Sequence, residues 1–355
     1  MHVEILRDDY RNIWNKFVAE SEQGHILQSY EWAKFKGAGS WEPFIIALME
    51  SNEIKAGISI LSRKVPFLGS KFFYAPRGPV VDFKDKDLVK TLIDAVRTEA
   101  GKRGAVALRI DPEIDETDSG AISTLKDIGF VSNKKQIQPR ATFIVDLERD
   151  IDSILSSFDE KTRYNVRLAE KKGVQVKRES NINGIEHFWK MYAETSKRDK
   201  FLIHPKEYYF KLKECLIDKD LADVFVAYFR GIPIASVVVF KFGKKILYMY
   251  GASLGVYRNM MPNHVLHWHV IKWAKENGYK QYDLWGVPVN PREGHPLYGV
   301  YRFKKGFNGK NRTWIGVYDI PFNRFLYWFV NFGIKIYQNF RSLLTKGRIS
   351  DSLAE

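Results

Sequence analysis

The basic segment RFKKGF near residue 305 contains residue types that could bind an anionic substrate. Arg302, Lys304 and Lys305 precede a glycine there. Cationic side chains and backbone N–H groups beside a glycine can converge on one phosphate, so the segment suits a phosphate-binding turn. A solvated surface turn would have the same composition, and the sequence leaves both interpretations open.

Two acidic residues and three histidines form further polar clusters. Asp111 and Glu113 follow the apolar run AVALRI and, lying two residues apart, project from one side of the chain. Catalysis and capping of the next segment explain this pair equally well.

His264, His267 and His269 are three and two residues apart, and such spacings cannot all share one helix face, so we expect no metal site.

Several familiar classes of enzyme are disfavoured because their motifs are missing from the sequence. There is no GxxxxGK[ST] loop, HExxH, CxxC, GxSxG, or GxGxxG after a strand. The single cysteine, Cys215, permits no internal disulfide and no cysteine-based metal cluster. We therefore expect no cofactor and no nucleotide, zinc or serine-hydrolase site.

Length and charge limit the remaining possibilities. A chain of 355 residues with 45% apolar composition is long enough for two domains. Its net charge of +14 favours a polyanionic partner: nucleic acid, an anionic membrane face or phosphorylated small molecules. No run of eighteen apolar residues occurs, and the N-terminal segment lacks the apolar core of a signal peptide, so we predict a cytoplasmic location.

The elements that position these residues are clearest between residues 246 and 309. Residues 246–253 are rich in tyrosine and apolar residues and predict a buried strand. After Pro262 the apolar residues take helical spacing until Gly278, and residues 279–287 predict another strand. The result is a strand, helix, strand unit that ends at the basic segment.

The same order of elements occurs twice in the chain. Each half has hairpin strands, a third strand, a long helix and a further strand, as in residues 44–110, where the helix spans 87–103. The two halves share the order of their elements but not their amino-acid sequence. It predicts an α/β (α+β) fold with domains at residues 1–148 and 149–320, followed by an aromatic and basic tail at 321–355.

Short motifs distributed along the chain resemble the FemABX family. They are ILQSYEWAKFK, FFYAPRGPVVDF, VALRIDPEI, PRATFIVDL, EKTRYNVRLAEKKGVQV, ILYMYGAS, YDLWGV and GVYRFKKGFNG, in the family's order. The resemblance implies two tandem GNAT-like domains with mixed central sheets flanked by helices. Some members carry a coiled-coil arm in the second domain, whereas the corresponding turn here is only FRGIPI, so the chain resembles the compact form.

The resemblance also implies an activity. The family transfers an amino acid from aminoacyl-tRNA to the side-chain amine of the stem peptide of a peptidoglycan precursor, lipid II or UDP-MurNAc-pentapeptide, and so builds the interpeptide bridge. The tRNA ester is already activated, so such an enzyme needs positioning and oxyanion stabilisation and no covalent nucleophile. The alternatives are a GNAT-type N-acyltransferase using acyl-CoA, whose Q/RxxGxG/A loop is not evident, and a nucleic-acid-binding protein without enzymatic activity.

Carried over by position, the resemblance implies a set of site residues. The residues implied to be catalytic are Lys36, His204 and Lys305, and those implied to bind substrate are Asp111, Tyr208, Lys304, Lys206, Arg77 and Tyr257. Lys304 and Lys305 are alternatives for one family lysine. His204 stands where the family has an arginine, with Lys206 as a substitute cation, and neither reproduces the bidentate fork of arginine. Lys36, Tyr208 and Arg77 also have structural explanations, as packed or loop-holding residues.

Two further segments have more than one interpretation. The helix that contains TRYNVRLAEKKG presents Arg163, Arg167, Lys171 and Lys172, either as a tRNA contact or as a solvated face. In the tail, aromatic residues from Phe325 to Phe340 alternate with Arg324, Lys335 and Arg341, which suits a peripheral helix at the inner membrane face. Packing against the protein body is the alternative. The sequence does not define an oligomeric state.

Overall fold

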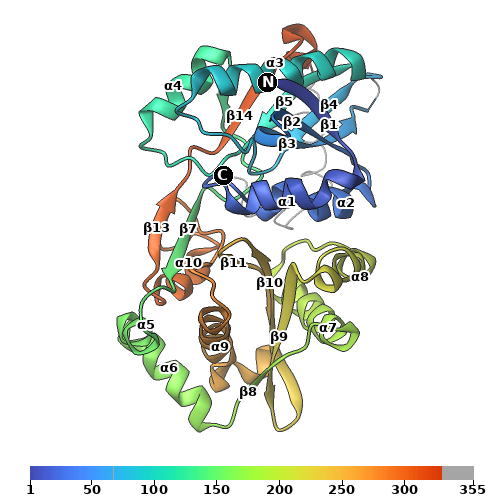
Figure 1. Cartoon of the computed structure of the whole chain (residues 1–355). Helices are drawn as coiled ribbons and strands as arrows, with labels where there is room; N and C mark the ends of the chain where they lie inside the picture. The colour runs from blue at the N-terminus through green and yellow to red at the C-terminus, as the bar shows by residue number, and fades with distance from the viewer. Residues whose placement is uncertain (67, 330–355) are drawn as a thin grey trace. The chain divides into compact units, whose positions relative to one another are not determined.

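The computed structural model describes residues 1–66 and 68–329, which form two units (Figure 1). Within the described residues, the first unit comprises Met1–Gln138 and the chain from Trp314 to Phe329, and the second comprises Pro139–Thr313. Each unit has a mixed sheet with helices on both faces. The expected tandem GNAT-like architecture is therefore confirmed.

The sheet of the first unit has the strand order β1-β2-β3-β4-β5-β14-β6. Its strands are β1 (His2–Leu6), β2 (Glu42–Glu50), β3 (Glu53–Lys64), β4 (Lys71–Ala75), β5 (Ala105–Ile110), β6 (Val131–Asn133) and β14 (Val317–Pro321). Its helices are α1 (Arg11–Glu20), α2 (Tyr30–Gly37), α3 (Lys86–Arg103) and α4 (Ser119–Ile128), with short 3-10 turns η1 (Asp8–Tyr10) and η2 (Ile26–Gln28). β4 and β5 are parallel and joined by α3, and the other pairings are antiparallel.

The sheet of the second unit has the order β13-β7-β12-β11-β10-β9-β8. Its strands are β7 (Ala141–Asp146), β8 (Gln175–Arg178), β9 (Ala222–Phe229), β10 (Ile232–Phe242), β11 (Lys245–Ser253), β12 (Gln281–Asp283) and β13 (Lys310–Thr313). Its helices are α5 (Ile151–Ser157), α6 (Glu160–Lys171), α7 (Ile182–Asp199), α8 (Lys206–Cys215), α9 (Pro262–Glu276) and α10 (Tyr298–Lys305), with 3-10 turns η3 (Ile217–Lys219) and η4 (Gly255–Met260). β11 and β12 are parallel and joined by α9.

The two sheets therefore repeat one topology, but each takes one strand from the other half of the chain. β7 pairs with β12 and β13 in the second sheet, and β14 pairs with β5 and β6 in the first. The division at residue 148 expected from the sequence differs from this arrangement, because pairing between strands far apart in sequence assigns β7 to the second unit. β14, which the sequence division placed in the second domain, belongs to the first.

The segment RFKKGF is helical, so the expected basic turn is wrong. Residues through Lys305 belong to α10, and the N–H groups of Gly306, Phe307 and Asn308 donate to the carbonyls of Arg302, Lys304 and Lys305. Backbone donors that bind within the helix end are not offered to a phosphate. Before this segment in the chain, residues 151–171 form two helices, α5 and α6, with a break around Asp159.

The beginning of the tail packs on the first unit and exposes an aromatic group. Leu326 and Tyr327 contact Val106 and Ala107 of β5, while Phe325, Trp328 and Phe329 are 74%, 62% and 48% exposed. The other tail residues of the proposed membrane helix, from Phe332 to Arg341, lie outside the described residues. Among the described helices, none is both long and apolar enough to cross a bilayer.

Candidate active site

The parallel strands β11 and β12 separate soon after they meet. They pair only from Lys245 to Leu247, after which β11 continues to Ser253 against β10 alone. Opposite Val238 and Val239, Met249 is an extra residue on β11 and forms a β-bulge. Tyr248 and Tyr250 lie on either side of this bulge. A bulge changes the directions in which the neighbouring side chains point. Crevices at the carboxyl ends of such strands are the usual ligand sites of α/β folds.

Lys304, in the last turn of α10, reaches the loop that follows β12. Its Nζ donates to the carbonyl oxygens of Trp285 at 3.3 Å and Gly286 at 2.8 Å, and lies 5.2 Å from the centre of the Tyr248 ring. The side chain is 6% exposed. An ammonium has three N–H donors, and the described residues provide carbonyl acceptors for two of them, so one remains for a substrate oxygen.

The loop that supplies these carbonyls is held in an uncommon conformation. Trp285 has φ +58°, in the left-handed region that side chains other than glycine rarely adopt. Its N–H donates to Asp283 Oδ1 at 2.7 Å, and its carbonyl also accepts from the Thr142 hydroxyl at 3.2 Å. Strained backbone held by several contacts is typical of functional sites. β7, through Thr142, therefore helps to fix the position of Lys304.

The environment of Lys304 brings its titration close to neutral pH. Burial lowers the pKa of Lys304 to about 7, and the Asp283 carboxylate partly opposes this shift. Burial also lowers the pKa of His267 to about 3, and the charge of Lys304 adds to the effect. His267 is thus neutral, and its Nδ1 lies 2.7 Å from the Tyr282 hydroxyl. Near neutral pH Lys304 therefore exists in both its charged and its neutral form.

A cluster of tyrosines joins β11 to α7 and α8. The hydroxyls of Tyr208 on α8 and Tyr250 on β11 are 3.5 Å apart, and Tyr192 on α7 packs against the Tyr250 ring at 6.1 Å. Burial raises the pKa of Tyr208 and of Tyr248 to about 12. These side chains are therefore neutral hydroxyls at neutral pH, and they can hydrogen-bond a polar substrate without adding charge.

The structure distinguishes the two candidate lysines, Lys304 and Lys305, by their burial. Lys305 is exposed at the end of α10, whereas Lys304 is buried. Neighbouring residues on a helix point about 100° apart, so only one of them can face the core. The roles implied for both residues stay predictions.

The other candidate residues of the second unit lie on two elements. His204 stacks on Tyr208, with ring centres 3.9 Å apart, and Lys206 lies 4.9 Å from the Phe210 ring and 3.8 Å from Glu186 Oε1. Tyr257 lies in η4 and packs near Phe229, with ring centres 6.2 Å apart. The structure thus brings His204 and Tyr208 together at one end of the tyrosine cluster.

Lys36, Asp111 and Arg77 belong to the first unit. Asp111 is 1% exposed, and its two carboxylate oxygens accept from the Tyr74 hydroxyl at 2.8 Å and the Arg77 N–H at 2.7 Å. Burial raises the pKa of Asp111, and the charge of Arg77 opposes this shift. These contacts hold the bend that follows β4. The substrate-binding roles implied for Asp111 and Arg77 stay predictions.

Lys36 is half-buried beside aromatic rings and a second cation. Its Nζ lies 5.6 Å from the Trp32 ring centre and 5.8 Å from that of Phe35. Burial, and to a lesser extent the charge of Arg63, lowers the pKa of Lys36. Because two neighbouring cations repel each other, an anion bound beside them would relieve that repulsion.

Sequence reasoning missed Tyr248, Tyr250, Asp283 and Trp285 as parts of the site. The run ILYMYGAS carried a signal, since its tyrosines are two residues apart and face one side of a regular strand. The left-handed conformation of Trp285 had no such signal, because glycine, asparagine and aspartate are the residues expected there.

Comparison with known proteins links this chain to one family. The description of the matching family model is "FemAB family", and the match covers residues 11–230 and 221–335. The lipid II:glycine glycyltransferase of Staphylococcus saprophyticus is 29% identical over 94% of this chain and 95% of its own length. The lipid II:glycine glycyltransferase of Staphylococcus haemolyticus is 27% identical over 95% and 96%.

The first of these alignments contains 403 positions but only 94% of the 355 residues here, so about 70 positions hold residues of the relative alone. This difference agrees with the compact form expected from the sequence.

Two solved structures share the fold. The crystal structure of FemX has a TM-score of 0.85 and 25% identity, covering 93% of this chain and 99% of that one. A tandem GNAT protein from the clavulanic acid biosynthesis pathway has a TM-score of 0.54 and 11% identity, covering 90% and 99%. The second similarity concerns the fold alone.

Proposed function

The chain belongs to the FemAB family, and from this premise we propose that it transfers an aminoacyl group from charged tRNA to the side-chain amine of the stem peptide of lipid II. The relatives named as lipid II:glycine glycyltransferases support the acceptor and make glycyl-tRNA the first donor to test. The exposed Phe325, Trp328 and Phe329 support an acceptor carried on a lipid, because exposed aromatic side chains favour the membrane interface.

The observation that carries the proposal is the buried ammonium of Lys304. In aminoacyl transfer, the neutral acceptor amine attacks the ester carbonyl carbon, and negative charge develops on the carbonyl oxygen. The free N–H of Lys304 would bind that oxygen. The bond from the carbonyl carbon to the ribose oxygen then breaks, the amine nitrogen loses a proton, the departing ribose oxygen takes up a proton and becomes a hydroxyl, and an amide remains on the acceptor. The step needs no covalent nucleophile and no cofactor.

The donor is the decisive point to test. Purified protein is incubated with lipid II and either glycyl-tRNA, a mixture of other charged tRNAs, or acetyl-CoA, and the stem peptide is analysed by mass spectrometry. We expect a gain of one aminoacyl residue with a charged tRNA and no gain with acetyl-CoA. Acetylation from acetyl-CoA alone would replace the proposal with a GNAT-type N-acyltransferase. UDP-MurNAc-pentapeptide in place of lipid II tests the choice of acceptor.

The pH dependence of kcat/KM is expected to report the titration of Lys304. Below pH 7 Lys304 is protonated, and the neutral fraction of an acceptor amine of pKa about 10.4 rises tenfold per pH unit. Above about pH 7 Lys304 loses its proton while the amine continues to become neutral, so the two effects cancel. We expect kcat/KM to rise with a slope of one up to about pH 7 and then level off.

The Lys304→Arg variant is the control for this profile, because arginine stays protonated throughout the range. Its kcat/KM, corrected for spontaneous hydrolysis of the donor, should continue to rise between pH 7 and pH 9. A levelling near pH 7 in both proteins would assign the titration to another group.

A further inference from the structure

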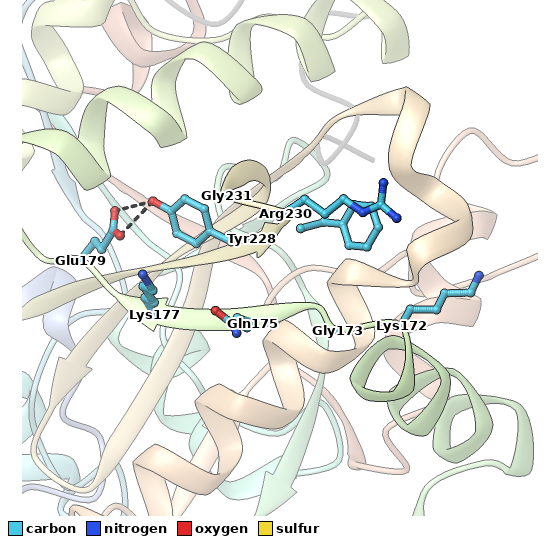
Figure 2. Close-up of a pocket in the computed structure, with 9 residues that line it drawn as sticks. Lys172, Gly173, Gln175, Lys177, Glu179, Tyr228, Arg230 and Gly231 are labelled. Atoms are coloured by element: carbon cyan, nitrogen blue, oxygen red, sulfur yellow. Dashed lines mark hydrogen bonds between the residues drawn. The ribbon is translucent and has the colours of Figure 1, made fainter.

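A cavity of about 510 Å³ in the second unit does not include Lys304 in its lining and is lined mainly by basic and polar residues. Figure 2 shows its lining, which comes from the end of α6, from β8 and from the tip of the β9–β10 hairpin. Lys172, Lys177 and Arg230 contribute three cations, and Glu179 contributes one carboxylate. The charge of the cavity lining therefore favours an anionic ligand.

The one carboxylate of this lining, Glu179, already has polar partners within the protein. Glu179 accepts hydrogen bonds from the Tyr228 hydroxyl at 2.8 Å and lies 3.4 Å from His187 Nδ1. The three cations make fewer polar contacts than this carboxylate. Lys172 donates to the Asn259 carbonyl, Lys177 lies over the Tyr228 ring, and Arg230 forms no salt bridge within residues 1–66 and 68–329.

The exposed face of α6 continues the basic surface from the cavity. Lys161, Tyr164, Arg167 and Lys171 fall within about 120° of one another around the helix, at 100° per residue, and all four are exposed. Tyr164 is 61% exposed, which is unusual for so large a ring between cations. Glu160 and Glu170 are the acidic residues of the helix, and Glu160 lies in the first turn, where a helix favours negative charge.

α6 also connects the cavity to the end of α10, which carries Lys304. The Asp159 N–H donates to the Gly306 carbonyl at 2.9 Å, and a Cβ on Gly306 would lie 2.3 Å from the Thr162 hydroxyl. From that end, the helix runs to Lys171 beside the cavity. Its length is about 18 Å at 1.5 Å per residue, or roughly five nucleotides of a stacked strand at 3.4 Å each.

We propose that the exposed face of α6 and the adjoining cavity bind the donor RNA, with Arg167, Lys171 and Arg230 contacting phosphates and Tyr164 stacking on a base. This inference rests on the proposed function, which supplies an RNA ester as donor. Cations that follow a strand, together with an aromatic platform, are the usual means of binding single-stranded nucleic acid. An anionic bilayer would need an apolar face as well, and Tyr164 is the only large exposed apolar group described on α6.

The test compares charge reversals on the proposed RNA-binding surface and on α7 of the same unit. The triple variant Arg167→Glu, Lys171→Glu, Arg230→Glu is expected to bind uncharged tRNA at least tenfold more weakly at about 0.1 M salt. The slope of log affinity against log salt should fall by about two to three, because each lost phosphate contact removes 0.7–0.9. The matched control Lys190→Glu, Lys197→Glu, Lys200→Glu reverses exposed lysines at α7 and its C-cap and should change the affinity less than twofold.

Tyr164→Ala separates stacking from charge. It should weaken binding about fivefold or more while leaving the salt slope unchanged, since base stacking contributes about 1–3 kcal/mol per base. Equal affinities of the wild-type protein, the triple variant and the α7 control would overturn the inference. So would equal losses in the triple variant and the α7 control, because those would reflect net charge alone.

A truncated donor distinguishes failure of this inference from failure of the proposed function. With a glycylated dinucleotide, which is too short to reach Arg167 and the cavity, the triple variant should transfer as fast as the wild type, although it is slower with glycyl-tRNA. An equal loss with both donors would contradict the RNA-binding role. If the wild type transfers from neither donor, the proposed function fails, and the tRNA affinities still decide whether this surface binds RNA.

Discussion

Replacing Lys304 with methionine is expected to lower kcat for aminoacyl transfer about 100- to 1,000-fold, with little change in KM. That is the usual cost of removing one donor to a developing oxyanion. Methionine has a similar length and retains contact with Tyr248, but it cannot donate to the carbonyl oxygen of the ester. Initial rates at saturating glycyl-tRNA and lipid II measure the effect.

Lys305→Met is the matched control, because it removes the exposed neighbour from the same helix turn. We expect less than a twofold change in kcat. A large loss in the Lys305 variant with normal activity in the Lys304 variant would exchange the two assignments.

Replacing Asp319 with alanine is expected to lower the free energy of unfolding of the first unit by about 3–5 kcal/mol. Asp319 on β14 is fully buried and accepts two hydrogen bonds from the Arg109 guanidinium on β5, at 2.7 and 2.8 Å. It also accepts from Asn133 and Tyr327. Its removal would leave the guanidinium buried without its carboxylate. Chemical denaturation followed by tryptophan fluorescence measures the loss.

The control is Glu148→Ala, which removes an exposed pair with Lys280 and should cost less than about 1 kcal/mol. The double variant Arg109→Met, Asp319→Leu should recover much of the stability, because apolar residues replace the whole ion pair. If Asp319→Ala cost no more than Glu148→Ala, the pairing of β14 with the first sheet would be contradicted.

Local patterns in the sequence predicted most of the elements but not how the two halves exchange strands. The α3 helix was readable from its apolar period and from Gly104, which adopts φ +67° at its end. The spacing of apolar residues in the strand, helix, strand unit from β11 to β12 was equally clear. The assignment of β7 and β14 was not, because their pairing joins segments more than a hundred residues apart.

The site was predicted only in part, because it also depends on contacts between segments that lie far apart in the sequence. The basic segment before Gly306 was recognised, but as a turn, and in a turn Lys304 and Lys305 are equivalent. As a helix, the segment places Lys304 with Phe307 on the buried side and Lys305 in solvent. Burial lowers the pKa of Lys304. The position of its ammonium depends on the carbonyls of Trp285 and Gly286, which follow from the left-handed conformation of Trp285 and the hydrogen bond of its N–H to Asp283. Sequence patterns do not encode such tertiary contacts.

Direct attack of the acceptor amine on the donor ester beside Lys304 can be tested in a single turnover. Excess protein is mixed with glycyl-tRNA and lipid II, and the masses of the intact protein and of the stem peptide are followed together. We predict that the stem peptide gains one glycyl residue while the protein mass never changes, and that Lys304→Met slows this gain at least a hundredfold. A glycyl group appearing on the protein before the peptide, or an unchanged rate in Lys304→Met, would contradict the mechanism.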